Sequence, residues 1–177
     1  MRLLFLVDVQ NLFYSVRDTY GVDARIDFKL LREEAICNRS FTSVRCVAYL
    51  THFKERDDIE GLKKALVLLS YETRIGKIRR TESGLAGTDM DVELATEAID
   101  KADEYDVIVV ASGDGDLIPA YKILKGRGKR VEVIAFSGSL GRSIGEEVDE
   151  VKYLGKGVLY VPREKGISGD GKKTQTE

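Results

Sequence analysis

The chain has 177 residues, of which 43% are hydrophobic and 33% charged, and its formal net charge is −2. This length is sufficient for one domain with a substantial core. The near-neutral charge excludes the strong overall positive field of many nucleic-acid-binding proteins. It leaves room for a local basic face, because electrostatic steering depends on how charge is distributed.

Two cysteines and one histidine limit the metal and nucleophile chemistry open to the chain. Cys37 and Cys46 do not stand in a metal-ligand spacing, so we interpret both as reduced thiols, which are typical of a cytoplasmic protein. The single histidine, His52, argues against a histidine-based triad or a zinc site. Asp8 interrupts the apolar N-terminus, and no stretch approaches the roughly 18 apolar residues of a membrane helix. We therefore expect a cytoplasmic protein without membrane contact.

The first half of the chain alternates between strand and helix patterns. The nearly continuous apolar run "RLLFLVDV" predicts a strand buried on both faces. Asp27 stands where the N-cap of a helix is expected. In chain order, the patterns predict strands at 2–9, 43–51 and 72–80, the last at a sheet edge, and helices at 10–20, 27–39 and 57–71.

The second half continues this alternation after a glycine-containing loop, which we expect at 81–90. Pro119 stands near the start of a predicted helix, where proline is favoured in the first turn. The patterns predict helices at 91–103, 116–128 and 139–151, and strands at 106–112, at 129–136 and within 152–162.

Strands alternating with helices predict the α/β class: a three-layer α/β/α, Rossmann-like fold around a mostly parallel sheet. We find no internal repeat and no linker before the polar C-terminal segment. We therefore expect one domain at residues 1–162. Residues 163–177 have almost no apolar side chains and are expected to form a disordered tail.

Acidic residues follow several of the predicted strands. Ligands of open parallel sheets bind outside the carboxyl ends of the strands. The first strand ends at an aspartate, the segment "SGDGD" follows the most apolar strand, and a third pair of aspartates precedes the helix at 91–103. We expect these segments to meet at one edge, with Asp8, Asp89, Asp91, Asp114, Asp116 and Asn11 as the candidate site residues.

Like charges in one cleft repel each other and are costly to desolvate, so a counter-charge is expected. Mg²⁺ or Mn²⁺ provides one, because these cations prefer carboxylate oxygens and water. Such a site can activate water and stabilise the leaving oxygen in phosphodiester cleavage. Each acid also has a local alternative: Asp8, Asp89 or Asp91 can cap a helix, and Asp114 and Asp116 can serve a turn.

Three segments resemble one known family: "FLVDVQNLFYS", "DMDVELATEAI" and "VIVVASGDGDLIPAYKILKGRGKRVEVIAF". Together they are similar to the NYN domain in its LabA-like branch, which belongs to the PIN-like nucleases. The resemblance covers roughly residues 2–155. It implies a PIN-like fold, Mg²⁺ or Mn²⁺ as cofactor, and cleavage of RNA.

The resemblance also implies roles for individual residues. The metal site would comprise Asp8, Asp91 and the pair Asp114 and Asp116, with Asp89 and Glu97 as further acids; Asn11 is the polar residue after the first strand, and Ser112 lies beside the pair. Relatives often carry a lysine shortly before the middle aspartate, whereas this chain reads "SGLAGTDM" there. We expect an endonuclease rather than an exonuclease.

Affinity for RNA must come mainly from contacts to phosphate. Of the basic residues, we favour Arg79, Arg80 and Arg142, because their loops are expected to lie nearest the acids. The expected partner is single-stranded RNA. An exposed edge strand or the last helix could also support a homodimer.

Two other functions stay open at this point. A magnesium-dependent phosphatase of the haloacid-dehalogenase type also uses strand-end aspartates, but it requires a second aspartate two residues after the first. Here the chain reads Asp8-Val9-Gln10. A PIN-like scaffold that binds RNA or protein without cleavage is the other alternative.

Overall fold

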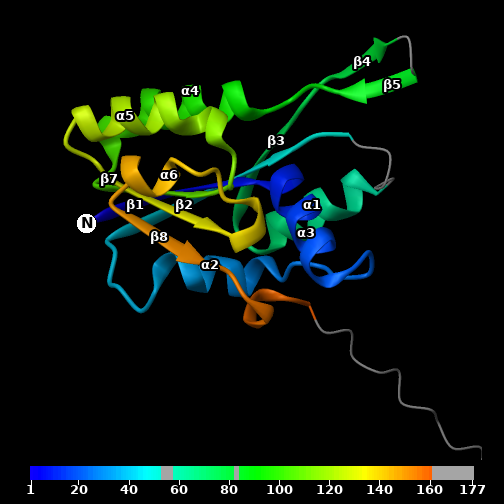
Figure 1. Cartoon of the computed structure of the whole chain (residues 1–177), viewed down its shortest axis with the longest axis horizontal. Coiled ribbons are helices and arrows are strands. Elements are labelled where there is room, and N and C mark those ends of the chain that lie inside the picture. The colour runs from blue at the N-terminus through cyan, green and yellow to red at the C-terminus, as the bar shows by residue number, and fades with distance from the viewer. Residues whose placement is uncertain (53–57, 82–83, 161–177) are drawn as a thin grey trace, which may run out of the picture.

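Helices and strands alternate along the chain, as the sequence predicts (Figure 1). The computed structural model describes residues 1–52, 58–81 and 84–160, and between residues 78 and 87 it describes only the backbone of the strands. The elements are β1 (Arg2–Asp8), α1 (Val9–Tyr20), α2 (Phe28–Ile36), β2 (Ser43–Leu50), α3 (Ile59–Leu68), β3 (Tyr71–Ile75), β4 (Ile78–Thr81), β5 (Gly84–Gly87), α4 (Asp91–Lys101), β6 (Val107–Ala111), α5 (Ile118–Gly126), β7 (Arg130–Ala135), α6 (Ile144–Glu147) and β8 (Glu150–Tyr153).

Six strands form the central sheet in the order β3-β2-β1-β6-β7-β8, and every adjacent pair is parallel. This confirms the predicted α/β class. The strand order reverses between β1 and β6, because the chain first builds the sheet outward through β2 and β3 and then returns to the other side of β1. In open α/β sheets this reversal is where ligands bind.

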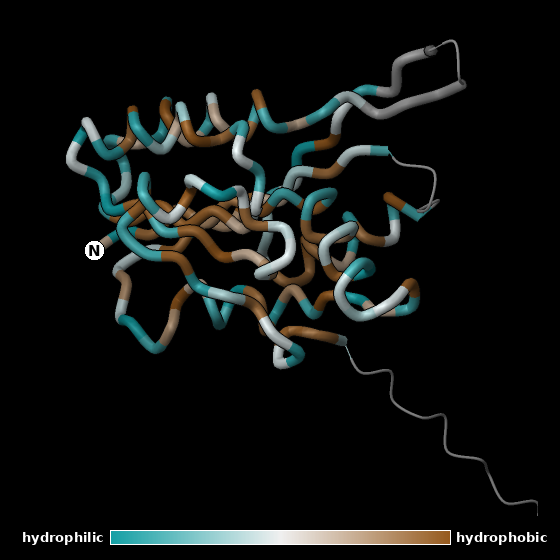
Figure 2. The backbone as a smooth tube through the Cα atoms, viewed as in Figure 1, coloured by the Kyte–Doolittle hydropathy of each residue, from teal (hydrophilic) through white to brown (hydrophobic). Residues whose placement is uncertain are grey.

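Successive residues of β1 are buried in two different cores. Leu3, Phe5 and Val7 belong to the core that includes α1, α2 and α3, whereas Leu4 and Leu6 belong to the core that includes α4 and α5. Figure 1 shows these helices on opposite sides of the sheet, and Figure 2 shows the hydrophobic colouring concentrated in the strands between them. A strand covered on both faces must be apolar at every position, which explains the run "RLLFLV".

Local capping explains where several helices begin. The carboxylate of Asp27 accepts hydrogen bonds from the backbone N–H groups of Lys29 and Leu30, which confirms its predicted role at the start of α2. Asp58 caps α3 in the same way, and Pro119 lies in the first turn of α5. Asp57 lies outside the described residues.

The segment 72–90 differs from its prediction as an edge strand followed by a loop. β3 does lie at the sheet edge but ends at Ile75, and β4 and β5 form a separate antiparallel ribbon (Figure 1). Gly76 marks the break. Its N–H donates to the carbonyl of Leu50, and an added Cβ would lie 2.7 Å from the Thr88 carbonyl oxygen. This close approach of the backbone directs the chain out of the sheet.

The predicted helix at 139–151 is also shorter than expected. Only Ile144–Glu147 is α-helical, and the chain enters β8 at Glu150. Asp149 ends the helix because its N–H donates to the carbonyl of Val131, while its carboxylate accepts the N–H of Val131. These long-range bonds to β7 outweigh the local helical pattern. The predicted tail lies outside the described residues, and the described part contains no helix long and apolar enough to cross a membrane.

Candidate acidic site at the sheet edge

Asp8 is the last residue of β1 and lies at the point where the strand order reverses. Its carboxylate accepts the N–H of Asn11 at 2.9 Å and the hydroxyl of Ser112 at 3.0 Å. The first bond caps α1, so the capping interpretation of Asp8 is confirmed. Asp8 is only 8% exposed, and burial raises its pKa to about 6 despite both hydrogen bonds. A group that only capped a helix would gain nothing from this burial.

The loop after β6 is tied to the same corner. The side-chain oxygen of Asn11 accepts the N–H of Gly113 at 2.9 Å, and Ser112 Oγ accepts the N–H of Asp114 at 3.2 Å. The N–H of Asp116 in turn donates to the Asp114 carboxylate. Asn11 and Ser112 therefore set the path of the "SGDGD" backbone, and this places Asp114 beside Asp8.

Gly113 is the one position of this loop with no space for a side chain. A Cβ there would lie 2.2 Å from the carbonyl oxygen of Ser139, in the loop after β7. The carbonyl of Gly113 also accepts the N–H of Gly141. The loops after β6 and β7 are thus packed backbone to backbone, which brings the segment before α6 to the acidic edge.

The third acidic segment precedes α4. The hydroxyl of Thr51, just after β2, donates to the carbonyl of Thr88, and the buried side chain of Met90 anchors the turn in the core. The backbone N-cap of α4 is Met90, so neither Asp89 nor Asp91 holds the N-cap position considered from the sequence. Instead, Asp89 lies one residue before the N-cap, and its carboxylate accepts the N–H of Asp91.

The acids from these segments share one electrostatic environment. Burial first, and then the negative charges of Asp8, Asp89 and Asp114, together raise the pKa of Asp91 to about 8. Asp114 and Asp89 also contribute to the raised pKa of Asp8. We call Asp8, Asp89, Asp91 and Asp114 the acidic cluster. Asp116, two residues after Asp114, is exposed.

Glu97, the other predicted acid, has different partners. Its carboxylate accepts hydrogen bonds from Arg45 at 2.8 Å, from Arg74 at 2.9 Å and from the hydroxyl of Tyr49 at 2.7 Å. Arg45 and Arg74 come from β2 and β3, so Glu97 joins α4 to the sheet. The structure does not bring Glu97 into the acidic cluster.

The donor chemistry of the acidic cluster suits a hard divalent cation. All of its side-chain ligand atoms are carboxylate oxygens, and burial together with neighbouring carboxylates raises the pKa of Asp8 and of Asp91 without a sufficient positive counter-charge. Within the described residues, no three acidic, histidine or cysteine side chains converge closely enough to enclose an ion. Mg²⁺ is commonly held by one or two carboxylates and several waters, so it does not require such an enclosure.

Of the three arginines predicted to bind phosphate, the structure describes the side chain of Arg142. Arg142 is exposed and follows Gly141, where an added Cβ would lie 3.2 Å from the backbone of Gly115 in the "SGDGD" loop. Arg142 therefore lies at the acidic edge. Arg79 and Arg80 lie in β4, and their side chains are outside the described part of the chain.

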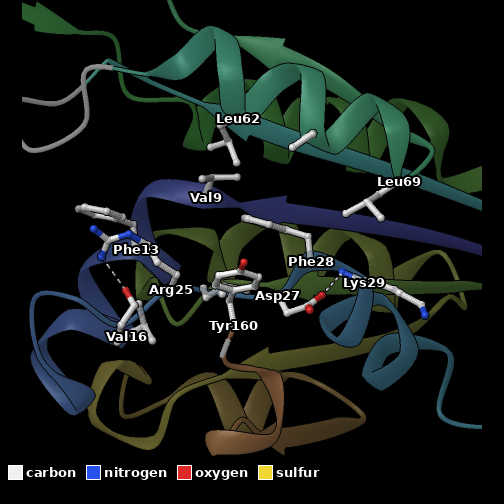
Figure 3. Close-up of a pocket in the computed structure, with 13 residues that line it drawn as sticks. Val9, Phe13, Val16, Arg25, Asp27, Phe28, Lys29, Leu62, Leu69 and Tyr160 are labelled. Atoms are coloured by element: carbon white, nitrogen blue, oxygen red, sulfur yellow. Dashed lines mark hydrogen bonds between the residues drawn. The ribbon is translucent and has the colours of Figure 1, made fainter. Parts of the chain in front are cut away.

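An apolar cavity of about 550 Å³ lies elsewhere, between α1, α2, α3 and the end of the described chain. Figure 3 shows Phe13, Phe28 and Tyr160 around it, and none of the acidic cluster lines it. Most of the residues that line the cavity are apolar. The acidic cluster therefore stays the candidate site, and this cavity is separate from it.

Tyr121 is a residue that the sequence does not single out, although the charges of Asp8, Asp114 and Asp91 act on its hydroxyl. Tyr121 and Leu124 are buried residues of α5, and Leu117 is buried just before this helix. The intervals of four and three residues between them are those of an ordinary helix face packed in the core. The polar end of a tyrosine at a core position is the only sequence signal that could have drawn attention to it.

Residues 2–154 match the NYN domain family. The chain belongs to the NYN domain family. It is 26% identical over 155 residues to the low amplitude and bright protein LabA of Synechococcus elongatus, a match that covers 84% of this chain and 81% of LabA. The predicted family resemblance is thereby confirmed.

The fold of this NYN domain also occurs in a crystal structure from Vibrio parahaemolyticus. The two structures superpose with a TM-score of 0.76 and 22% sequence identity, covering 90% of this chain and 96% of the other. That protein is described as one of unknown function, so the similarity concerns the fold. NYN domains are generally PIN-like ribonucleases.

Proposed function

We propose that this NYN domain is a metal-dependent ribonuclease that hydrolyses phosphodiester bonds of RNA at the acidic cluster. The observation that carries this proposal is that Asp8, Asp91 and Asp114 interact electrostatically at the strand-order reversal, where burial and mutual repulsion raise the pKa of the first two. Buried carboxylates that repel each other destabilise the metal-free fold. Such groups are found mainly where function requires them.

Asp8, Asp91 and Asp114 would hold Mg²⁺ or Mn²⁺ directly or through waters, with Asp89 and Asp116 close enough in the chain to complete the shell. When bound, the cation would activate a water molecule and neutralise charge on the scissile phosphate. Asn11 and Ser112 keep the "SGDGD" loop in place through the bonds described above. We assign no metal-binding role to Glu97, because its carboxylate is already paired with two arginines.

Positive charge near the cluster is required to bind a polyanion beside four carboxylates. Arg142 is the described residue that best fits this role, and the β4–β5 ribbon carries Arg79 and Arg80. We expect single-stranded RNA as substrate and internal cleavage. A circular single-stranded RNA tests the latter, because only an endonuclease can open it.

The test is cleavage of labelled linear and circular RNA with Mn²⁺ or Mg²⁺, by the wild type and by Asp114→Asn. A matched control is Asp100→Asn, which removes an exposed acid at the far end of α4. We expect metal-dependent cleavage that EDTA stops, that Asp114→Asn lowers at least 100-fold, and that Asp100→Asn leaves intact. Equal cleavage by wild type and Asp114→Asn would contradict the proposal. RNA binding without cleavage by either would instead favour the non-catalytic scaffold.

A further inference from the structure

The hydroxyl of Tyr121 is buried without a protein partner. Tyr121 is 1% exposed, and within the described residues its hydroxyl is the one buried side-chain polar atom that has no hydrogen bond. Folded proteins rarely leave such a group unpaired, because it loses its hydration without compensation. A phenylalanine would fill the same space without this cost, so the hydroxyl needs an explanation.

Tyr121 lies on α5, the helix that follows the "SGDGD" loop, about one turn after Leu117. It belongs to the core between the sheet and α4 and α5, together with Met90 and Leu117. Met90 immediately precedes Asp91, and Leu117 immediately follows Asp116. The core that holds the ring therefore also holds the residues that anchor two of the acidic segments.

The electrostatic environment of the hydroxyl also comes from the cluster. Burial raises the pKa of Tyr121 above its usual range, and the charges of Asp8, Asp114 and Asp91 raise it further. The hydroxyl therefore keeps its proton at physiological pH and can act only as a neutral donor or acceptor. Carboxylates are the strongest acceptors within its surroundings.

We propose that Tyr121 is a positioning residue of the acidic cluster, whose hydroxyl donates through a bridging water to the cluster carboxylates and orients them for a divalent cation. A bridging water fits because no carboxylate lies within direct hydrogen-bonding distance of the hydroxyl. Groups that orient metal ligands typically change metal affinity by about 10–100-fold. The proposal rests on the proposed function in one respect, namely that the cluster binds a cation.

The first experiment measures Mn²⁺ affinity by calorimetry and unfolding temperature without metal, in the full chain. Tyr121→Phe removes only the hydroxyl, and Tyr71→Phe is the matched control. Tyr71 is equally buried, but it lies in the opposite core and donates to the carbonyl of Phe28 at 2.8 Å. We expect Tyr121→Phe to weaken Mn²⁺ binding about tenfold or more without lowering the unfolding temperature. Tyr71→Phe should lower the unfolding temperature and leave Mn²⁺ affinity unchanged.

Unchanged Mn²⁺ affinity in Tyr121→Phe would overturn the inference, because a purely structural tyrosine gives that result. A second measurement separates this failure from failure of the proposed function. Titration of the cluster carboxylates by NMR in metal-free protein should show a higher pKa for Asp8, Asp91 or Asp114 in Tyr121→Phe, because a donor to the charged form is lost. If the wild type binds no Mn²⁺, the metal proposal fails, and this titration alone decides whether Tyr121 contacts the cluster.

Discussion

At the scale of single residues, burial and like charge determine the character of the site. Asp91 is partly buried among three other carboxylates, and its pKa of about 8 lies far above the value for an exposed aspartate. The free energy needed to ionise it is drawn from the stability of the fold. The same desolvation makes the site receptive to a cation, which replaces the missing counter-charge.

Asp91→Asn should therefore stabilise the metal-free protein at pH 8. The folded-state pKa is raised, so the unfavourable contribution of Asp91 is absent below the unfolded value near 4 and grows as pH rises toward 8. We expect a gain of about 2 kcal/mol at pH 8, less than the full shift implies because Asp91 is partly exposed. Urea unfolding at pH 8 and pH 3.5 measures this. An equal gain at both pH values would show that loss of the buried, repelled charge is not the cause.

At the scale of elements, the site depends on contacts between loops that follow different strands. Asn11 on α1 binds the loop after β6, and that loop packs on the one after β7. These contacts link three strand ends through short backbone distances. The placement of Asp114 thus depends on groups that carry no charge.

Gly113→Ala should displace the "SGDGD" loop. The new Cβ would lie 2.2 Å from the Ser139 carbonyl oxygen, a contact that backbone must move to relieve. We expect a loss of about 2 kcal/mol in unfolding free energy together with lower Mn²⁺ affinity.

Gly138→Ala is the control for this change, because an added Cβ there meets no atom within 4 Å. It lies in the neighbouring loop and should change both quantities little. A Gly113→Ala protein with wild-type stability and metal affinity would show that the two loops can separate without consequence.

At the scale of the whole molecule, ion pairs hold helices to the sheet on the side away from the acids. Arg39, just after α2, donates two hydrogen bonds to Glu132 on β7, at 2.6 and 2.8 Å. Glu132 is 7% exposed. Burial alone would raise the pKa of Glu132, but the bonds from Arg39 and Arg130 lower it.

Arg39→Ala should destabilise the fold by about 3 kcal/mol at pH 7, because it leaves a buried carboxylate with only the more exposed Arg130. Because the pKa of Glu132 is lower in the folded state than in the unfolded state, its ionised form stabilises the fold above the usual glutamate pKa, and this stability is lost as the pH falls. The cost should therefore shrink at pH 3. Arg2→Ala, which removes an exposed pair with Asp106, should cost less than about 1 kcal/mol. Denaturant unfolding at both pH values measures each change.

The near-neutral net charge implies that RNA binding relies on a few local cations. Arg142→Ala should weaken binding of a single-stranded RNA severalfold, independent of its sequence, and reduce the slope of log affinity against log salt by about 1. Arg127→Ala changes a residue at the opposite end of α5 and should leave the slope unchanged. An unchanged slope in Arg142→Ala would exclude a phosphate contact there.

The sequence by itself determined the α/β class, the buried first strand, the cap at Asp27 and the strand-end positions of Asp8 and "SGDGD". These features follow from hydrophobic periodicity and local capping, which act over a few residues. Family membership could also be predicted from the sequence, because the motifs of the family are short and contiguous.

Only the tertiary structure decided which polar groups meet. Glu97 and Asp91 lie on one helix, yet arginines from β2 and β3 pair with Glu97 while Asp91 lies among other carboxylates. The break in the chain at Gly76 and the early end of α6 likewise depend on hydrogen bonds to residues of distant segments, Leu50 and Val131. Burial, and with it the cost of a charge or of the Tyr121 hydroxyl, arises only when segments far apart in the chain pack together.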